Sequence, residues 1–191
     1  TGSETSCVVR AISRLEDPAL VTGHGRFTAD LAVAHWVRFV LSPVAAGRID
    51  RITAPPSTHL ITAADLKALK PIRPMLHKFN YKPVGQPVLA DGIVRFIGEL
   101  VAAVVAKSEE EAEDIVDRVE LSIDEMPSVA DARDALKAGA PQVHAEAAGN
   151  IILAGKVKTP GFDSIWSSAH TIVKIDTRSR RQKATPLEAR G

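Results

Sequence analysis

Histidine is the residue of this chain best suited to metal binding or acid–base catalysis, and its six copies are dispersed. They are His24, His35, His59, His77, His144 and His170. A histidine metal site on a helix or a turn needs ligands a few residues apart, and no pair here has that spacing. We interpret them as surface or strand histidines with local partners. The sequence therefore predicts no metal-binding residue.

The motifs that would indicate catalysis or a nucleotide cofactor are missing or incomplete. No serine lies in a Gly-x-Ser-x-Gly turn, so a hydrolase triad is not favoured. Gly23-His24-Gly25 precedes a strand-like segment instead of following one, and no third glycine opens a helix after it, which argues against a dinucleotide site. No Gly-Lys-Ser/Thr loop is present to bind phosphate. We predict no catalytic and no cofactor-binding residue.

Two basic clusters could bind anions. The first lies in an irregular, proline-rich loop over 70–87 and combines cations with aromatic rings: Arg73, His77, Lys78, Phe79, Tyr81 and Lys82. Stacking and phosphate contacts of this kind occur in nucleic-acid sites. Because the net charge is only +1, we favour a surface loop anchored by its aromatic residues and predict no nucleic-acid partner. The second cluster either binds anions or lies against something absent from this chain: Arg178, Arg180, Arg181, Lys183 and Arg190.

Composition indicates a folded protein outside membranes. Hydrophobic residues make up 45% of the 191 residues and charged residues 25%, which is a globular balance. The single cysteine, Cys7, excludes an intrachain disulfide and is consistent with a reducing, cytoplasmic compartment. No apolar run approaches the length of a membrane span. We therefore expect no membrane association.

The elements that would position any site are centred on Leu100–Ala106, which contains no polar residue. So short and apolar a run predicts a strand buried on both faces. Asp91-Gly92 before it predicts a hairpin, with a strand over Ile93–Ile97. Ser108 and Glu111 form a capping box, so the acid run that follows is interpreted as the solvated face of a helix and not as a cation site.

The rest of the chain predicts strands mixed with a few short helices. A return strand is expected over 119–123, and other strands over 35–41, 48–53, 58–61, 151–157 and 170–176. A turn or the start of a helix is expected at Asp17-Pro18, and short helices are expected over 62–69, 131–138 and 162–169. Because the helices do not alternate with every strand, the predicted class is α+β, with a mixed sheet and helices on one side.

Two stretches carry a family resemblance. RLEDPALVTGHGRFTADL at 14–31 resembles the opening segment of the large, molybdenum-carrying subunit of the xanthine dehydrogenase, aldehyde oxidase and carbon monoxide dehydrogenase family. PVLADGIVRFIGELVAAVVA at 87–106 resembles that subunit's α/β-hammerhead domain. Ser42-Pro43-Val44 to Ile49 is similar to the family's segment after the first strand, and PLEARG at 186–191 resembles a motif at the start of the cofactor-binding part that follows. Leu100 and Ala189 stand where the family commonly has proline, and the usual Pro-Gly is missing at 32–34.

The resemblance implies a division of the chain and a role in a larger enzyme. We expect an N-terminal arm over 1–17, a hammerhead domain over 18–135, and a linker with the truncated start of the molybdopterin-binding domain over 136–191. Complete members carry a molybdenum–pterin cofactor and work with iron–sulfur and FAD subunits. They hydroxylate aldehydes or N-heterocycles, or oxidise carbon monoxide. The family's catalytic and cofactor-binding residues lie beyond the equivalent of Gly191, so none is assigned here.

Three functions remain open from the sequence. The first is a structural and assembly portion of a molybdenum hydroxylase, which would be inactive by itself. The second is a stand-alone hammerhead-like interaction module without enzyme activity. The third is a small anion- or nucleotide-binding protein that uses the basic loop. If the chain is one part of a larger subunit, its residues from Ile151 onward should lack their neighbours, and they should be exposed or pair with a second copy of the chain.

Overall fold

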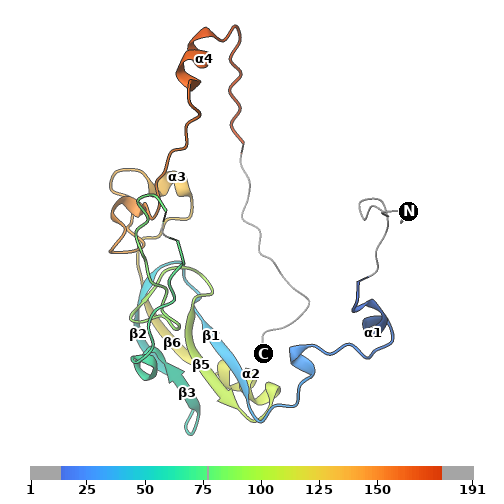
Figure 1. The fold of residues 1–191 in the computed structure, drawn as a ribbon. Coiled ribbons are helices and arrows are strands. Elements are labelled where there is room, and N and C mark those ends of the chain that lie inside the picture. The colour runs from blue at the N-terminus through green and yellow to red at the C-terminus, as the bar shows by residue number, and fades with distance from the viewer. Residues whose placement is uncertain (1–13, 77, 178–191) are drawn as a thin grey trace, which may run out of the picture. The chain divides into compact units, whose positions relative to one another are not determined.

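The computed structural model describes residues 14–76 and 78–177 and divides the chain into two units. Of the described residues, the first unit takes in 14–33 and 172–177, and the second takes in the remainder, within Ala34–Thr171. In the first unit, α1 (Asp17–Val21) begins beside Pro18, as the sequence predicts, and a 3₁₀ helix, η1 (Thr28–Asp30), follows. All the described strands belong to the second unit (Figure 1).

The described strands form two small antiparallel sheets. The first has the order β1 (Trp36–Leu41), β5 (Leu100–Ala106), β3 (His59–Thr62). The second has the order β4 (Ile93–Val94), β2 (Gly47–Thr53), β6 (Glu120–Glu125). The α+β class is confirmed, and the expected mixed sheet is resolved into two sheets whose described pairs are all antiparallel.

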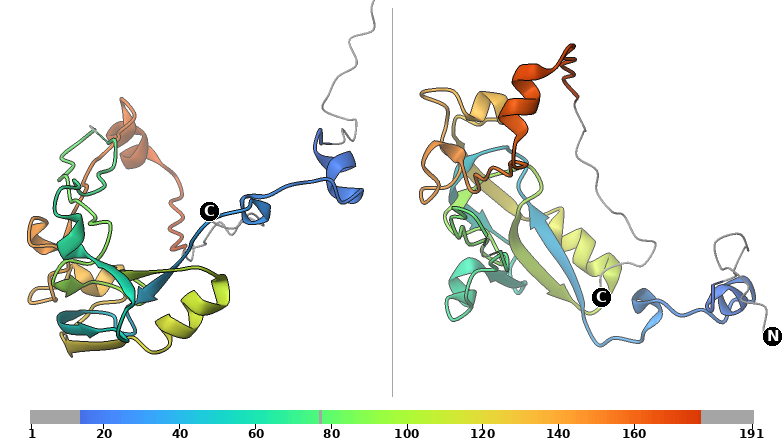
Figure 2. Two further views of the ribbon diagram at one scale, coloured as in Figure 1. Left: turned by 90° about the horizontal axis from the view of Figure 1, so that it is seen from below. Right: turned by 45° about the horizontal axis from the view of Figure 1, so that its top comes forward.

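The main core lies between the first sheet and α2 (Glu109–Val116). Ala102, Val104 and Ala106 alternate along β5, so they share one face of the sheet. They pack with Ala112 and Ile115 of α2, and side chains of β2 and β6 join the same cluster. Accordingly α2 and the second sheet lie on one side of the first sheet, which Figure 2 shows from two directions.

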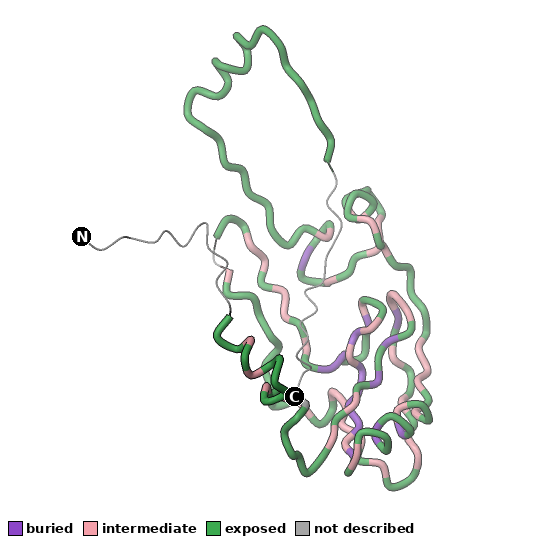
Figure 3. The backbone as a smooth tube through the Cα atoms, turned by 90° about the vertical axis from the view of Figure 1, so that its right-hand side faces the viewer, coloured by how far each residue is buried: buried purple, intermediate pink, exposed green. Residues whose placement is uncertain are grey.

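A second cluster of buried residues connects β5 to the second sheet. Val94 and Val101 are completely buried and pack with Ala90, while Ile49 and Ile123 are partly buried against them. Together the two clusters bury β5 almost throughout, in agreement with the prediction from its composition. Buried positions are concentrated in this part of the second unit (Figure 3).

The other helices are single turns or little more. They are η2 (Ala63–Leu66), α3 (Ala132–Ala135), η3 (Ala148–Asn150) and α4 (Phe162–Ser168). Three of them fall where helices are predicted, and the side chains of Asp65 and Asp131 bond backbone N–H groups at the starts of η2 and α3. The predicted extents to residues 69 and 138 are too long.

The prediction of a hairpin at Asp91-Gly92 is wrong, although the chain does turn there. Gly92 has φ +69, as a tight turn requires. The strand that follows ends at Val94 and pairs with β2, and the segment before the turn is not a strand. A second turn at Gly98, with φ +83, ends the extended run that was expected to reach Ile97.

The strands predicted over 151–157 and 170–176 are also absent, because an extended segment becomes a strand only where another strand bonds to it. Every residue of 151–177 is exposed, including Ile152, Val157 and Val173. Of the outcomes expected for the chain from Ile151 onward, exposure is the one found over 151–177, and residues 178–191 lie outside the described residues.

Candidate functional site

The loop between β4 and β5 holds a buried charged pair that the sequence analysis missed. Glu99 is only 5% exposed and accepts a hydrogen bond from the Arg95 backbone N–H. Nη1 of Arg95 lies 3.8 Å from Oε1 of Glu99. A carboxylate this deep needs such partners, because burial of an unpaired charge is costly. The sequence did carry a signal for this pair, because an Arg and a Glu stand four residues apart within an otherwise apolar run.

The same loop is bonded to the residue that follows β1. Gly98 N–H donates to the Ser42 carbonyl at 2.8 Å, and Ser42 N–H donates to the Glu99 carbonyl at 2.9 Å. Ser42 is itself buried, and its hydroxyl donates to the Val44 carbonyl at 2.9 Å. These bonds join the β4–β5 loop firmly to the end of β1.

His144 lies in the electrostatic field of this pair. Burial lowers the pKa of the His144 imidazole, and the positive charge of Arg95 lowers it further, while Glu146 and Glu99 act in the opposite direction. Neutral histidine is therefore favoured. The segment that carries it is tied together by Asn150, whose amide donates to the carbonyls of Ala135 at 3.0 Å and Pro141 at 2.9 Å.

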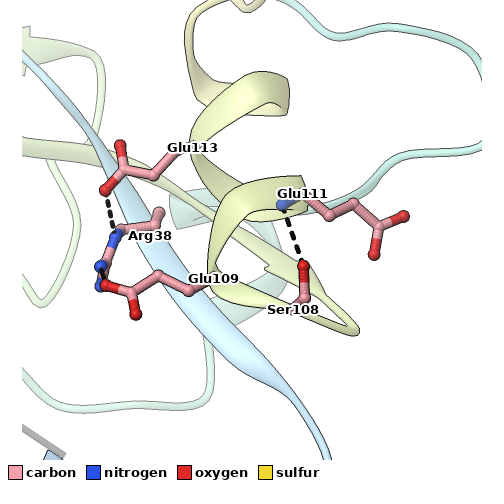
Figure 4. Close-up of polar contacts among 5 residues, drawn as sticks. All are labelled: Arg38, Ser108, Glu109, Glu111 and Glu113. Carbon is pink, nitrogen blue, oxygen red and sulfur yellow. Dashed lines mark hydrogen bonds and ion pairs between the residues drawn. The ribbon is translucent and has the colours of Figure 1, made fainter.

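Two glutamates of the acid run form ion pairs with an arginine side chain on β1. Arg38 forms ion pairs with Glu109 and Glu113 of α2 (Figure 4). The hydrogen bond to Glu113 is the largest cause of a raised Arg38 pKa. At the start of the helix the Ser108 hydroxyl accepts from Glu111 N–H at 3.2 Å, and the Glu111 carboxylate accepts from Lys107 N–H at 2.9 Å. The acid run thus caps α2 and fastens it to the sheet.

The described histidines are not brought together. Nδ1 of His24 lies 3.0 Å from the Thr22 hydroxyl oxygen. His35, His59 and His170 are exposed. His77 lies outside the described residues. Within the described ranges no group of three His, Cys, Asp or Glu side chains is placed to hold a metal ion.

The basic loop is only partly anchored by its aromatic residues. Tyr81 is half-buried, whereas Phe79 is 59% exposed. Ile72 and Gln86 form an antiparallel bridge across the loop, and Lys82 N–H donates to the Ile152 carbonyl at 2.8 Å. Arg73 and Lys78 are exposed. The basic residues predicted from 178 onward, and Cys7, lie outside the described residues.

The functional surface best defined by the fold is an apolar one. Val37 and Phe39 on β1 are exposed on the first sheet, although they belong to a regular strand. Over the described part of the chain, no helix is long and apolar enough to cross a bilayer. A small α+β scaffold with a doubly apolar central strand and uncovered apolar side chains is typical of a domain that packs against other domains.

The chain belongs to the aldehyde oxidase and xanthine dehydrogenase family, whose a/b hammerhead domain matches residues 22–127. It is 31% identical to the nicotine 6-hydroxylase large subunit of Paenarthrobacter nicotinovorans, over 95% of this chain and 23% of that protein. It is 36% identical to the carbon monoxide dehydrogenase large chain of Hydrogenophaga pseudoflava, over 92% of this chain and 24% of that protein.

Solved structures agree with this assignment. The Cu,Mo-CO dehydrogenase structure is similar with a TM-score of 0.63 and 27% identity, over 84% of this chain and 22% of that chain. The fold is therefore that of the hammerhead domain of molybdenum hydroxylases, as the resemblance predicts. The chain spans less than a quarter of the length of these relatives.

Proposed function

We propose that this chain is the N-terminal structural and assembly portion of the large subunit of a molybdenum-dependent hydroxylase or dehydrogenase. The observation that carries the proposal is the match itself, which covers nearly all of this chain but less than a quarter of each relative. Its domains are then an arm over 1–17, the hammerhead over 18–135, and a linker with the start of the next domain over 136–191. The complete enzyme works in the cytoplasm with iron–sulfur and FAD subunits.

We propose no molybdenum–pterin site among the described residues. Glu99 and Ser42 are the buried polar residues of the described part, and each is bonded within the chain. Two further buried atoms, the Tyr81 hydroxyl oxygen and Arg95 Nε, have no hydrogen-bond partner among the described residues. His144 is kept neutral by burial and by Arg95. In the complete assembly the cofactor would supply the oxygen transfer and electron transfer. We assign no catalytic, cofactor-binding or metal-binding residue to this chain.

The proposed contribution of the chain is a rigid body for the rest of the subunit. The Arg38 ion pairs fix α2 to β1, and the Ser42–Glu99 bonds fix the β4–β5 loop to the end of the same strand. Both sets of contacts hold β5 at the centre of its sheet. A central strand held from both ends supports a stable surface for another domain.

Expression of the 191-residue chain by itself, in a bacterium that makes molybdenum–pterin cofactor, tests the claim that it does not catalyse alone. We expect a folded protein with no stoichiometric molybdenum or pterin and no dye reduction with aldehydes, N-heterocycles or carbon monoxide. Stoichiometric cofactor, or turnover that survives gel filtration, would show that the chain is itself an enzyme.

A further inference from the structure

One face of the first sheet carries a block of apolar side chains that the rest of the described chain leaves partly open. The strand register places two cross-strand rows on this face. Val105 lies between Val37 and His59 in one row, and Ala103 lies between Phe39 and Ile61 in the other. We call these side chains the outer face: Val37, Phe39, Ile61, Ala103 and Val105.

The outer face differs sharply from the opposite face of the same strands. Val40, Ala102 and Val104 on the opposite face are buried beneath α2 and the second sheet. On the outer face Val37 and Phe39 remain 44% and 40% exposed. Ala103 is small and is flanked on both sides by larger residues, which explains its own low exposure.

The composition of β5 indicates that both faces are meant to be covered. A strand with water on one face alternates polar and apolar residues, whereas a strand covered on both faces is apolar throughout. Leu100–Ala106 is apolar throughout. On the outer face Ala103 and Val105 of β5 are already buried or half-buried, whereas Val37 and Phe39 of the neighbouring β1 stay exposed. The cover of this face is therefore incomplete over β1, and α2 and the second sheet, which lie on the opposite face, do not supply it.

The size of the outer face favours a domain of the same polypeptide over a second copy. A stable dimer between separate chains needs about 800 Å² and roughly 20–30 residues from each partner. Five side chains fall far short of that. Contacts between domains of one chain tolerate smaller areas because the covalent link keeps the local concentration high. The relatives of this chain are more than four times as long as the part it matches.

We propose that the outer face is the docking surface for the part of the molybdenum subunit that lies outside this sequence. This inference rests on the proposed function and specifies which surface serves assembly. The covering element is expected to be apolar at its centre, because the rows opposite it contain aliphatic and aromatic side chains with one exposed imidazole, His59, at the edge.

Photo-cross-linking in the native host tests the inference. Phe39 is replaced by p-benzoylphenylalanine, which keeps an aromatic ring at the site, and the matched control carries the same residue at Met75, which is 94% exposed in the basic loop. We expect position 39 to cross-link to peptides of the molybdenum subunit outside this sequence and position 75 to give markedly less. Cross-links to a second copy of the chain, to an unrelated protein, or to nothing would overturn the inference.

A charged variant provides an independent measurement. Val37→Lys combined with Phe39→Lys should lower the molybdenum that co-purifies with the chain by at least about tenfold, because two charges would be buried in an apolar contact. Met75→Lys should leave it unchanged. The circular dichroism spectrum of the isolated double variant should remain that of a folded protein, since Val37 and Phe39 keep 44% and 40% of their surface exposed there. If molybdenum co-purifies with the wild-type chain and the double variant retains as much of it, the docking face is refuted and the proposed function stands.

Discussion

Gly47 begins β2 at a point where a side chain has no room. A Cβ built there would lie 2.3 Å from Cγ2 of Ile123 and 2.9 Å from the Asp124 carbonyl oxygen on β6. Gly47→Ala should therefore lower the free energy of unfolding by about 1–3 kcal/mol through overpacking. Urea denaturation of the purified chain measures this loss.

A double-mutant cycle separates crowding from other effects of the added methyl group. Ile123→Ala removes the nearer of the two contacts, so the combined variant should be less destabilised than the sum of the two single variants, by about 0.5 kcal/mol or more. Simple additivity would show that Gly47 is not required for this packing.

His144 should make stability depend on pH. Its folded pKa lies below the ordinary value of about 6.5, first because it is partly buried and then because Arg95 is positive. The folded state thus resists protonation. The stabilising contribution of neutral His144 is complete above the ordinary pKa and is lost as pH falls from that value through the folded pKa.

The comparison is between the wild type and His144→Gln at about pH 7.5 and about pH 5.5, values that bracket the ordinary histidine pKa. We expect the wild type to lose more of its unfolding free energy on acidification than the variant does. Carboxylates titrate in both proteins, so the difference between the two isolates the imidazole. Identical pH dependence in the two proteins would contradict a lowered His144 pKa.

At the scale of elements, the start of α2 depends on one hydroxyl. The Ser108 side chain accepts from Glu111 N–H, which would otherwise have no partner at the helix terminus (Figure 4). Ser108→Ala should cost about 1 kcal/mol of stability in chemical denaturation. Ser128→Ala, at an exposed position outside the helices and strands, is the control and should change little. Equal effects of the two substitutions would argue against the cap.

The buried strand β5 should be the part of the second unit least tolerant of lost volume. Val104 has no exposed surface and packs in the main core. Val104→Ala should cost about 2 kcal/mol by leaving a cavity, whereas Val157→Ala, at an 89% exposed position, should change stability by less than about 0.5 kcal/mol. Thermal unfolding of both variants measures the difference. A Val104→Ala protein as stable as the wild type would place β5 outside the core.

Elements with strong local signals could be predicted from the sequence. The apolar run of β5 and the capping box of α2 carry their own evidence within a few residues, and both elements form there. The pairing of β4 could not be predicted, since β2 lies more than forty residues away in sequence and local turn chemistry at Asp91-Gly92 favoured a neighbour instead. The predicted strands beyond residue 150 have suitable alternation and no partner strand in the described chain.

Candidate site residues were predicted less well than elements. The buried Glu99–Arg95 pair is local and had a signal in its four-residue spacing, whereas the effect of Arg95 on His144 depends on the tertiary fold. Spacing in sequence reveals little about the electrostatic influence of Arg95 and Glu99 on His144. The basic loop was expected to be anchored by two aromatic residues, and only Tyr81 is even half-buried.

At the scale of the whole molecule, the proposed function accounts for two features of the described residues. Residues 151–177 are exposed throughout, with apolar side chains among them, and the outer face of the first sheet has no described cover. Both would follow if the chain, as proposed, is one portion of a larger subunit and makes its remaining contacts with the rest of it. Pairing of the tail between two copies of the chain is the alternative arrangement that would also cover apolar residues.

Analysis of the assembly that carries this chain in its native host tests the central claim most directly. The chain is affinity-tagged, purified under native conditions, and assayed for molybdenum and for polypeptides that resemble the rest of a molybdenum hydroxylase. We predict about one molybdenum per copy of the chain, held in an assembly much larger than 20.4 kDa. Recovery of the tagged chain with neither molybdenum nor a family partner would contradict the claim and favour a stand-alone interaction module.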